Sequence, residues 1–226
     1  MLKLGLLGKD IQHSKSPQIY DELYSGQVEY SLLDVSSEDK IPCLKDIFKT
    51  LQGLSITAPY KKHFLNDVIL EESVRKIGAI NCIKFDGTQF YGTNTDFLAA
   101  KEIILNNAYH KKDIVMLGDG AMTDMFKVLF EELNISYHQF SRRKDGDLNA
   151  VKYEQYVELD NLLIINCCAR QFQFNLSLST KSIFWDMNYS HPFHHSFLSN
   201  KLTYIDGSEL LYLQAVAAKK FWNFTL

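Results

Sequence analysis

The chain lacks the features that mark secreted, metal-binding and membrane-spanning proteins. It has four cysteines among 226 residues: Cys167 and Cys168 are adjacent, Cys43 and Cys82 are isolated, and none forms a CxxC pair or a metal-ligand spacing. The apolar run Leu4–Leu7 is too short for a signal peptide, and no stretch approaches the length of a membrane span. We therefore expect reduced thiols, no bound metal and a cytoplasmic protein.

A strong excess of one charge is also absent. The 24 Lys and Arg residues nearly balance the 27 Asp and Glu residues, for a formal net charge of -3. This balance gives no broad basic surface for nucleic acid or an anionic membrane, although a local basic spot occurs at residues 142–144. A small-molecule partner is therefore expected.

What the chain does contain is the patterning of an α/β protein, with an ordinary apolar share of 46%. Strand-like apolar runs alternate with segments of helical spacing in the first half, an order that suggests a mostly parallel sheet with helices on its faces. The predicted strands are residues 3–8, 28–35, 54–57, 79–85 and 89–92. The predicted helices are residues 18–24, 41–51 and 70–77.

A domain boundary is predicted near residues 95–97, where the spacing turns helical up to Asn106. The second half then alternates strands and helices in the manner of a dinucleotide-binding domain. Its predicted strands are residues 114–117, 135–140, 162–165 and 183–187, and its predicted helices are residues 122–133 and 208–222.

A glycine-rich turn follows the strand at 114–117. Gly118, Gly120 and Ala121 stand between this strand and an amphipathic helix, an arrangement that lets a backbone approach a pyrophosphate at a helix N-terminus. Thr123 replaces the third glycine of the usual fingerprint, and Asp119 adds a negative charge. A plain tight turn therefore remains the alternative.

Basic residues follow the next strand, where an Asp or Glu would bond an unphosphorylated ribose. Ser141, Arg142 and Arg143 come directly after Phe140. Cations at this place suit a 2′-phosphate and hence NADP. A solvated basic loop is the alternative.

Ordered polar motifs run along the chain. In the first half they are His13-Ser-Lys-Ser-Pro17, Thr57-Ala-Pro-Tyr-Lys61, Ala79-Ile-Asn-Cys82 and Asn94-Thr-Asp96. In the second half they are Gly118-Asp-Gly120, Asn166 after a strand, Asp186-Met-Asn-Tyr189, and Asp206-Gly-Ser-Glu-Leu-Leu-Tyr-Leu-Gln214. With this set, the sequence resembles shikimate dehydrogenase over nearly its whole length.

The resemblance implies an enzyme of aromatic amino-acid biosynthesis that interconverts 3-dehydroshikimate and shikimate with NADP. It implies a substrate-binding domain of residues 1–96, completed by a C-terminal helix at 207–226, and a Rossmann-like NADP-binding domain of residues 97–206. The expected partner is the small-molecule substrate, and the chain could be a monomer or a homodimer.

Lys61 and Asp96 would be the proton-transfer pair. A ketone that gains a hydride develops alkoxide character, so a nearby ammonium stabilises the charge and can donate the proton. Asp96 would orient Lys61 and favour its charged form.

The resemblance also assigns binding roles. The residues implied for the substrate are Ser14, Ser16 and Tyr189 at its carboxylate, and Ser55, Thr57, Asn81 and Gln214 at its ring oxygens. The residues implied for the cofactor are Gly118, Gly120, Ala121, Ser141, Arg142, Arg143, Asn166 and Gly207. Ser55 departs from the family, which commonly has asparagine there.

Several of these residues have simpler interpretations. Ser14 and Ser16 could cap the following helix, Asp96 could cap the helix after it, residues 61–63 could be a solvated charge cluster, and Gln214 could be a surface residue. His191, His194 and His195 are interpreted as a loop, and the adjacent Cys167 and Cys168 as buried.

Two functional alternatives remain open from the sequence. One is a quinate or quinate/shikimate dehydrogenase, which would use the same residue types. The other is a non-catalytic shikimate-binding relative with a degraded cofactor site, because Ala121 to Asp124 and residues 169–176 depart from the family pattern.

Overall fold

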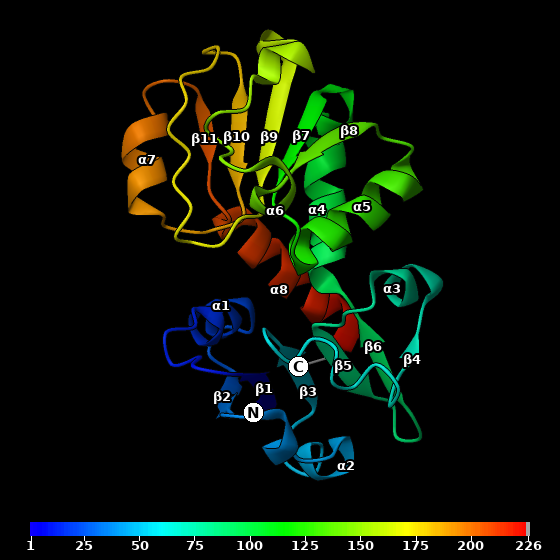
Figure 1. Ribbon diagram of the computed structural model, residues 1–226. Coiled ribbons are helices and arrows are strands. Elements are labelled where there is room, and N and C mark those ends of the chain that lie inside the picture. The colour runs from blue at the N-terminus through cyan, green and yellow to red at the C-terminus, as the bar shows by residue number, and fades with distance from the viewer. Residues whose placement is uncertain (225–226) are drawn as a thin grey trace. The chain divides into compact units, whose positions relative to one another are not determined.

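Residues 1–224 form two β-sheets, shown in Figure 1. The computed structural model describes residues 1–224, so residues 225 and 226 of the predicted C-terminal segment lie outside the described part. The chain divides into unit 1, Met1–Ala99 with Tyr212–Leu226, and unit 2, Ala100–Leu211. The division falls within helices α4 (Thr95–Asn106) and α8 (Ser208–Trp222).

Unit 1 contains a six-stranded sheet with the order β2-β1-β3-β5-β6-β4. Strands β2, β1 and β3 run parallel, β5 pairs antiparallel with β3 and β6, and β4 pairs parallel with β6. Its strands are β1 (Leu2–Gly8), β2 (Val28–Asp34), β3 (Gly53–Ile56), β4 (Ile69–Leu70), β5 (Cys82–Phe85) and β6 (Phe90–Thr93). Its short helices are α1 (Ser16–Leu23), a 3-10 turn (Glu38–Lys40), α2 (Leu44–Ile47) and α3 (Glu72–Ile77).

The C-terminal part of α8 completes the core of unit 1. Trp222 is buried with Leu2, Leu4 and Tyr20, and its ring centroid lies 5.4 Å from that of Tyr20. Its indole Nε1 donates a hydrogen bond of 2.9 Å to the carbonyl of Ile83 in β5. A late segment of the sequence therefore stabilises the sheet that the first strands form.

Unit 2 contains a five-stranded sheet with the order β11-β10-β9-β7-β8, and every pairing is parallel. Its strands are β7 (Asp113–Leu117), β8 (Tyr137–Phe140), β9 (Leu162–Asn166), β10 (Ile183–Asp186) and β11 (Thr203–Ile205). The central strand β9 is buried at every residue, as expected of a parallel strand covered on both faces. This is a Rossmann-like sheet, and the predicted α/β class is confirmed.

The two faces of the unit 2 sheet are covered differently. On one face, Phe126 of helix α5 (Ala121–Leu133) packs edge-on against Trp185 at 5.7 Å between ring centroids. On the other face, an irregular segment of residues 167–182, here called the aromatic strap, runs between β9 and β10 without a helix. Phe174 of the strap is fully buried, with its ring centroid 4.9 Å from that of Phe184. The strap shares this face with helix α7 (Pro192–Leu198), whose His194 ring centroid lies 5.4 Å from that of Phe184.

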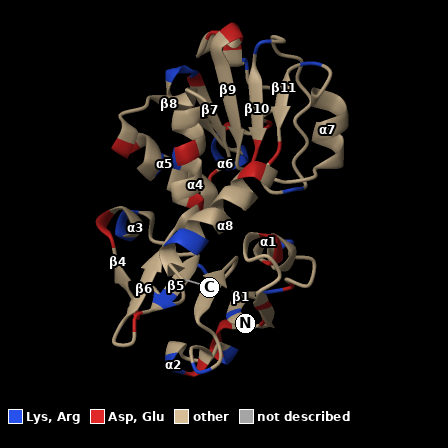
Figure 2. Cartoon of the chain, turned by 180° about the vertical axis from the view of Figure 1, so that it is seen from behind, with Lys and Arg blue, Asp and Glu red and all other residues tan. Residues whose placement is uncertain are grey.

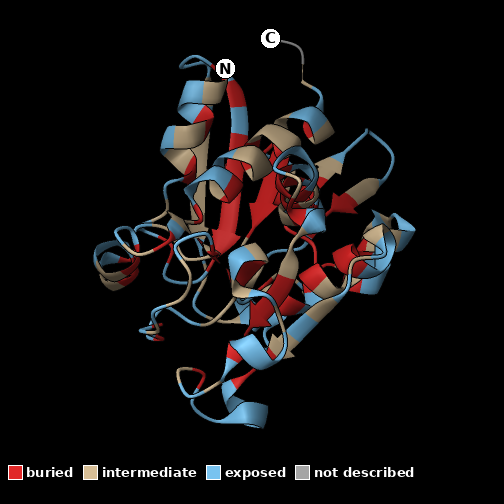
Figure 3. Ribbon diagram, turned by 90° about the horizontal axis from the view of Figure 1, so that it is seen from above, coloured by how far each residue is buried: buried red, intermediate tan, exposed pale blue. Residues whose placement is uncertain are grey.

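Buried residues concentrate on the strands, while the helices expose one side (Figure 3). Lysine, arginine, aspartate and glutamate are interspersed in each unit (Figure 2), in keeping with the near balance of charge. No helix among residues 1–224 is both long and apolar enough to cross a membrane.

The structure corrects several predicted elements. The helix expected over residues 41–51 is only the four-residue α2, because Pro42 favours an extended Ile41 (φ -72°, ψ 123°) and Cys43 is also extended. The helix expected from residue 70 begins at Glu72, since residues 69–70 form the edge strand β4. The sequence analysis missed α6 (Arg142–Asp145), α7 (Pro192–Leu198) and β11.

Candidate functional site

The predicted catalytic pair is in contact within unit 1. Lys61 Nζ donates a hydrogen bond of 2.6 Å to Asp96 Oδ2, and the two side chains are only 23% and 15% exposed. The Lys61 carbonyl accepts a 2.8 Å hydrogen bond from the Ile80 amide, which ties the segment after β3 to the residues before β5. An ammonium and a carboxylate are therefore held together in a partly desolvated place.

The simpler interpretations of this pair are wrong. Helix α4 is capped by Asn94, whose Oδ1 accepts a 3.0 Å hydrogen bond from the Phe97 amide, so Asp96 is not the cap. Lys61 is also not part of one solvated cluster, because His63 faces Glu38 at 2.8 Å while Lys61 faces Asp96.

Two further predicted substrate residues meet beside the pair. Asn81 Oδ1 accepts hydrogen bonds from the amide and the hydroxyl of Thr95, at 2.6 and 3.1 Å. The same Thr95 hydroxyl lies 3.3 Å from Gln214 Oε1 of α8. Hydrogen bonds thus link Asn81, Thr95 and Gln214. Because Thr95 directly precedes Asp96 in the sequence, this network adjoins the lysine–aspartate pair. Gln214 is therefore half-buried in this network and not a surface residue.

Three hydroxyl residues follow the carboxyl ends of the parallel strands β1 and β3, where ligands commonly bind in α/β sheets. Ser14 Oγ accepts a 3.2 Å hydrogen bond from the Ser16 amide, and Ser16 is buried in the first turn of α1. The N-cap of α1 is Lys15, without a side-chain cap, so capping by Ser16 does not occur. Thr57 is half-buried directly after β3.

Ser55 faces the interior of unit 1. It is buried, and its Oγ lies 3.4 Å from the hydroxyl of Tyr20. Burial, followed by the nearby Tyr30 and Cys82, raises the pKa of Tyr20 well above its usual value, so this phenol stays protonated at neutral pH.

The glycine-rich turn of unit 2 has the geometry that close backbone approach requires. Gly118 has φ of 117°, and an added Cβ would lie 3.1 Å from the Cys167 carbonyl oxygen, so no other residue fits without strain. Gly120 is the N-cap of α5, and an added Cβ there would meet nothing within 4 Å. The turn therefore leaves open space at a helix N-terminus, which suits a phosphate group.

A groove of about 720 Å³ lies against this turn. It is lined by Gly118, Asp119, Gly120, Ala121, Met122, Arg142, Arg143, Cys167, Cys168 and Ala169. The predicted cofactor residues from the turn and two of those after β8 thus line one cavity. The cavity combines backbone amides with two guanidinium groups, and this donor set fits a dinucleotide phosphate.

The residues after β8 begin a short helix and not a loop. Ser141 caps α6 by accepting a 3.3 Å hydrogen bond from the Lys144 amide. Arg143 Nε lies 3.3 Å from Asp119 Oδ2, a pair whose side chains are 85% and 38% exposed. The negative charge in the turn is therefore balanced by a nearby cation, and such an exposed pair is weak enough to exchange for a ligand.

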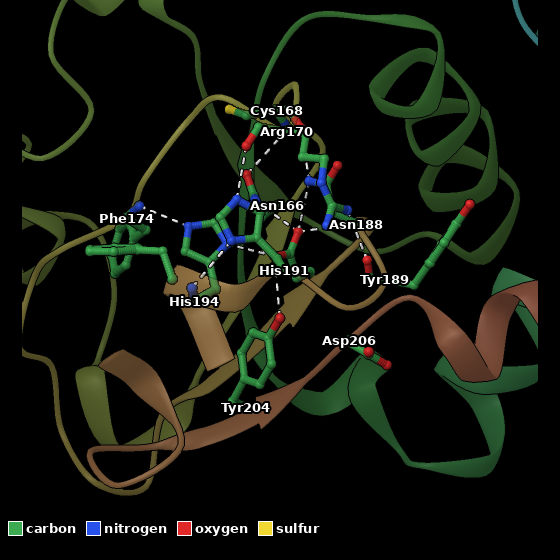
Figure 4. Close-up of polar contacts among 12 residues, drawn as sticks. Asn166, Cys168, Arg170, Phe174, Asn188, Tyr189, His191, His194, Tyr204 and Asp206 are labelled. Carbon is green, nitrogen blue, oxygen red and sulfur yellow. Dashed lines mark hydrogen bonds and ion pairs between the residues drawn. The ribbon is translucent and has the colours of Figure 1, made fainter. Parts of the chain in front are cut away.

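A buried carboxylate organises the ends of β9 and β10. Asp186 Oδ1 accepts hydrogen bonds from Asn166 Nδ2 at 2.9 Å and from the amide and side chain of Asn188 at 3.0 Å each. Asp186 Oδ2 lies 2.6 Å from His194 Nδ1 and 3.5 Å from the Tyr204 hydroxyl. Figure 4 shows the partner side chains Asn166, Asn188, His194 and Tyr204 turned toward one another.

Both ends of the Asn166 side-chain amide are bonded in this network. Its Oδ1 accepts a 3.2 Å hydrogen bond from the Cys168 amide, and the residue is completely buried. Close packing explains why residue 207 is a glycine, because an added Cβ would lie 2.6 Å from the Met187 carbonyl oxygen. Neither Asn166 nor Gly207 is among the residues that line the groove, and their contact with the cofactor stays a prediction.

The histidine segment was wrongly interpreted as a loop. His191 is the N-cap of α7, and His194 is completely buried within that helix. His194 Nε2 accepts a 2.9 Å hydrogen bond from the Phe174 amide, so Nδ1 carries the proton that faces Asp186. Among residues 1–224, no three His, Cys, Asp or Glu side chains are grouped to hold a metal ion.

The adjacent cysteines are half-buried, and not buried as expected, because they line the groove. Burial raises the pKa of the Cys168 thiol to about 11, although nearby Arg142 opposes this, so the thiol is not a ready nucleophile.

Tyr189 is half-buried in unit 2, directly before Ser190.

One unit has a Rossmann-like sheet with an open glycine turn, and the other α/β unit holds a lysine–aspartate pair. These features define the class of two-unit, dinucleotide-dependent oxidoreductases. Comparisons with known proteins narrow this class. The family model described as shikimate dehydrogenase substrate binding domain matches residues 6–83. A protein of Clostridium beijerinckii named shikimate dehydrogenase (NADP(+)) is 30% identical over 178 residues, which cover 72% of this chain and 66% of that protein. The chain belongs to the shikimate dehydrogenase family.

Further comparisons cover the full length. A Clostridium botulinum protein of the same name is 25% identical over 253 residues, covering 98% of this chain and 96% of the relative. The solved structure of shikimate dehydrogenase from Aquifex aeolicus has a TM-score of 0.79 at 19% identity, with 99% of this chain and 92% of that chain covered. The structure from Thermus thermophilus, in complex with NADP(H) and shikimate, has a TM-score of 0.77 at 21% identity and covers 100% and 95%. At these identities the two solved structures establish the fold.

The Asp186 network predicts acid-sensitive stability. Burial raises the pKa of Asp186, but hydrogen bonds from His194 and Asn188 outweigh burial and hold it below its ordinary value. An unfolded Asp has a pKa of about 3.9, so this stabilisation is complete above about pH 5 and is lost as the pH falls through the lower folded value. We expect Asp186→Asn to lower the free energy of unfolding by about 3 kcal/mol at pH 7 and by less at pH 3.

Urea unfolding of both proteins between pH 7 and pH 3 measures this difference. The exposed Asp21→Asn is the matched control and is expected to change stability little at any pH. A difference between wild type and Asp186→Asn that stays constant over the whole pH range would contradict the prediction.

Proposed function

We propose that this protein is an NADP-dependent oxidoreductase that interconverts 3-dehydroshikimate and shikimate. The observation that carries the proposal is the 2.6 Å contact between Lys61 and Asp96, in a family whose substrate-binding domain matches residues 6–83. The named relatives are NADP(+) shikimate dehydrogenases, which does not favour the quinate alternative. The open glycine turn does not favour a degraded cofactor site.

Lys61 acts on the oxygen of the reacting carbonyl. When the ketone is reduced, negative charge grows on this oxygen, and the ammonium stabilises the charge and donates a proton to it. In the reverse direction, the lysine accepts the proton from the hydroxyl. Asp96 holds the ammonium in place and favours its charged form, and the low exposure of both groups strengthens these interactions relative to bulk water.

NADP would be held in unit 2 and would supply or accept the hydride when bound. The backbone of Gly118, Gly120 and Ala121 would face the pyrophosphate at the N-terminus of α5. Arg142 and Arg143, with Ser141 fixing the start of α6, would bind the 2′-phosphate. Asn166 and Gly207 would support the same groove.

The substrate would be bound by the neutral polar groups around the pair. Asn81 keeps its carbonyl end on Thr95, which orients its Nδ2 group for a ring hydroxyl, and Gln214 and Thr57 would serve the remaining oxygens. Ser14, Ser16 and Tyr189 would hold the carboxylate through hydroxyls. With Ser55 turned toward Tyr20, the contact that asparagine makes in the family would be absent or weaker.

We also infer that the protein acts in the cytoplasm, as a monomer or a homodimer. The free cysteines, of which Cys82 is buried and Cys167 and Cys168 are half-buried, agree with a reducing compartment. Cell fractionation tests the location, and recovery from an oxidising compartment would oppose it. Sedimentation measurements would give the oligomeric state.

The activity itself is tested with purified protein. We expect shikimate-dependent reduction of NADP, with much slower reduction of NAD and little turnover of quinate. A folded sample without turnover of shikimate on either cofactor would refute the proposed function.

Lys61→Ala tests the proton-transfer role. We expect kcat to fall by about 10²- to 10⁴-fold, while shikimate binding changes far less, because the interaction strengthens as charge develops in the transition state. Steady-state kinetics and calorimetric titration measure the two effects. The exposed neighbour Lys62→Ala is the control and should keep wild-type kinetics. Equal losses of binding and turnover in Lys61→Ala would argue against the role.

Arg142→Ala tests the 2′-phosphate site. We expect binding of NADP to weaken by about tenfold or more, because a charge-assisted hydrogen bond is lost, with little change for NAD. Titration of each cofactor measures the preference. Arg75→Ala, which removes an exposed arginine of unit 1, is the matched control. An unchanged preference for NADP would assign the phosphate to other residues.

A further inference from the structure

The turn that carries Tyr189 adopts a backbone shape that needs support. It links β10 to α7 over the residues between Asp186 and Pro192. Ser190 lies in the left-handed region with φ of 52°, which residues with a side chain seldom adopt without surrounding contacts. The position of the Tyr189 backbone therefore depends on the contacts that stabilise Ser190 in this conformation.

Arg170 of the aromatic strap holds this turn. Its Nη1 donates a 2.9 Å hydrogen bond to the Tyr189 carbonyl, and its Nη2 donates a 2.8 Å hydrogen bond to the Ser190 carbonyl. A planar guanidinium can bond two adjacent acceptors at once, which a lysine ammonium does less well. On the other side of the turn, Asp206 Oδ2 accepts a 3.0 Å hydrogen bond from the Ser190 amide.

The backbone of Arg170 is in turn held by His191, the last residue before α7. The His191 ring is nearly buried, and its Nε2 donates a 2.8 Å hydrogen bond to the Arg170 carbonyl. The ring Nδ1 accepts a 3.2 Å hydrogen bond from the His194 amide, which fixes the tautomer and the ring orientation. Strap and turn thus hold each other through a closed ring of hydrogen bonds, drawn in Figure 4.

The side chain of Tyr189 extends away from this ring of contacts (Figure 4). Arg170 binds the two backbone carbonyls on either side of Ser190, those of Tyr189 and of Ser190 itself. We infer that Arg170 is a positioning residue: it fixes the backbone from which the Tyr189 phenol, the proposed ligand of the substrate carboxylate, extends. This inference rests on the proposed function, because the substrate role of Tyr189 belongs to it.

Kinetics of Arg170→Ala test the inference. We expect KM for shikimate to rise about three- to tenfold, as for the loss of one or two hydrogen bonds, while KM for NADP stays within about twofold. Arg170→Lys should recover part of the loss, since one carbonyl can still be bonded. Arg75→Ala is the matched control and should match wild type. Equal increases in KM for both ligands would indicate a merely structural role and overturn the inference.

A double-mutant cycle with Tyr189→Phe separates a role through Tyr189 from an independent one. If Arg170 acts by placing the phenol, Arg170→Ala should raise KM for shikimate far less in the Tyr189→Phe background than in wild type. Fully additive effects, or a Tyr189→Phe variant that binds shikimate normally, would overturn the inference.

Hydrogen exchange gives a readout that does not depend on activity. In Arg170→Ala, the amides of residues 189–191 should exchange faster, with the strands of unit 2 unchanged. Wild-type protein without turnover would refute the proposed function and with it the substrate role, whereas unchanged exchange in an active enzyme would refute only the inference about Arg170.

Discussion

A carboxylate removed from water must be surrounded by hydrogen-bond donors, and Asp186 meets this requirement with groups from several segments of unit 2. Asn166 comes from the end of β9, His194 from α7 and Tyr204 from β11. The groove-lining Cys167 and Cys168 follow Asn166 directly, and the turn with Tyr189 follows Asp186 directly. The proposed cofactor groove and the proposed substrate tyrosine therefore share one buried anchor.

In unit 1, capping of helix α4 and pairing with Lys61 are carried out by different residues, Asn94 and Asp96. The Asn94 side chain caps α4 by accepting a hydrogen bond from the Phe97 amide, and the Asp96 carboxylate faces Lys61. Thr95 between them turns its hydroxyl to Asn81 and Gln214. Three consecutive residues thus serve a helix start, the proposed substrate network and the proposed proton-transfer pair. This arrangement follows from the helix, in which successive side chains point in different directions.

The sequence was sufficient for the features that local patterning determines. Buried parallel strands are apolar runs, so β1, β7, β9 and β10 could be located closely, and the glycine turn after β7 could be predicted from Gly118 and Gly120. Lys61 and Asp96 are 35 residues apart, and only the resemblance to a family brought them together before the structure did.

Elements fixed by tertiary contacts could not be predicted in this way. The segment with His191 and His194 looks polar and irregular, yet it forms α7, because the Asp186 carboxylate and the Phe174 amide satisfy the buried His194 ring. One local signal was available, since Pro192 stands at a favoured first position of a helix. The pairing of Arg170 with the Tyr189 turn had no signal, because neither residue type nor spacing specifies a bond to a backbone carbonyl.

The burial of Trp222 beside Leu2, Leu4 and Tyr20 has a consequence for synthesis on the ribosome. Unit 2 is one continuous stretch, Ala100–Leu211, and all of it is translated before the segment that begins at Tyr212. Unit 1 begins first but needs that last segment to bury its sheet. The half that carries Lys61 therefore cannot complete its core until the last segment of the chain has been made.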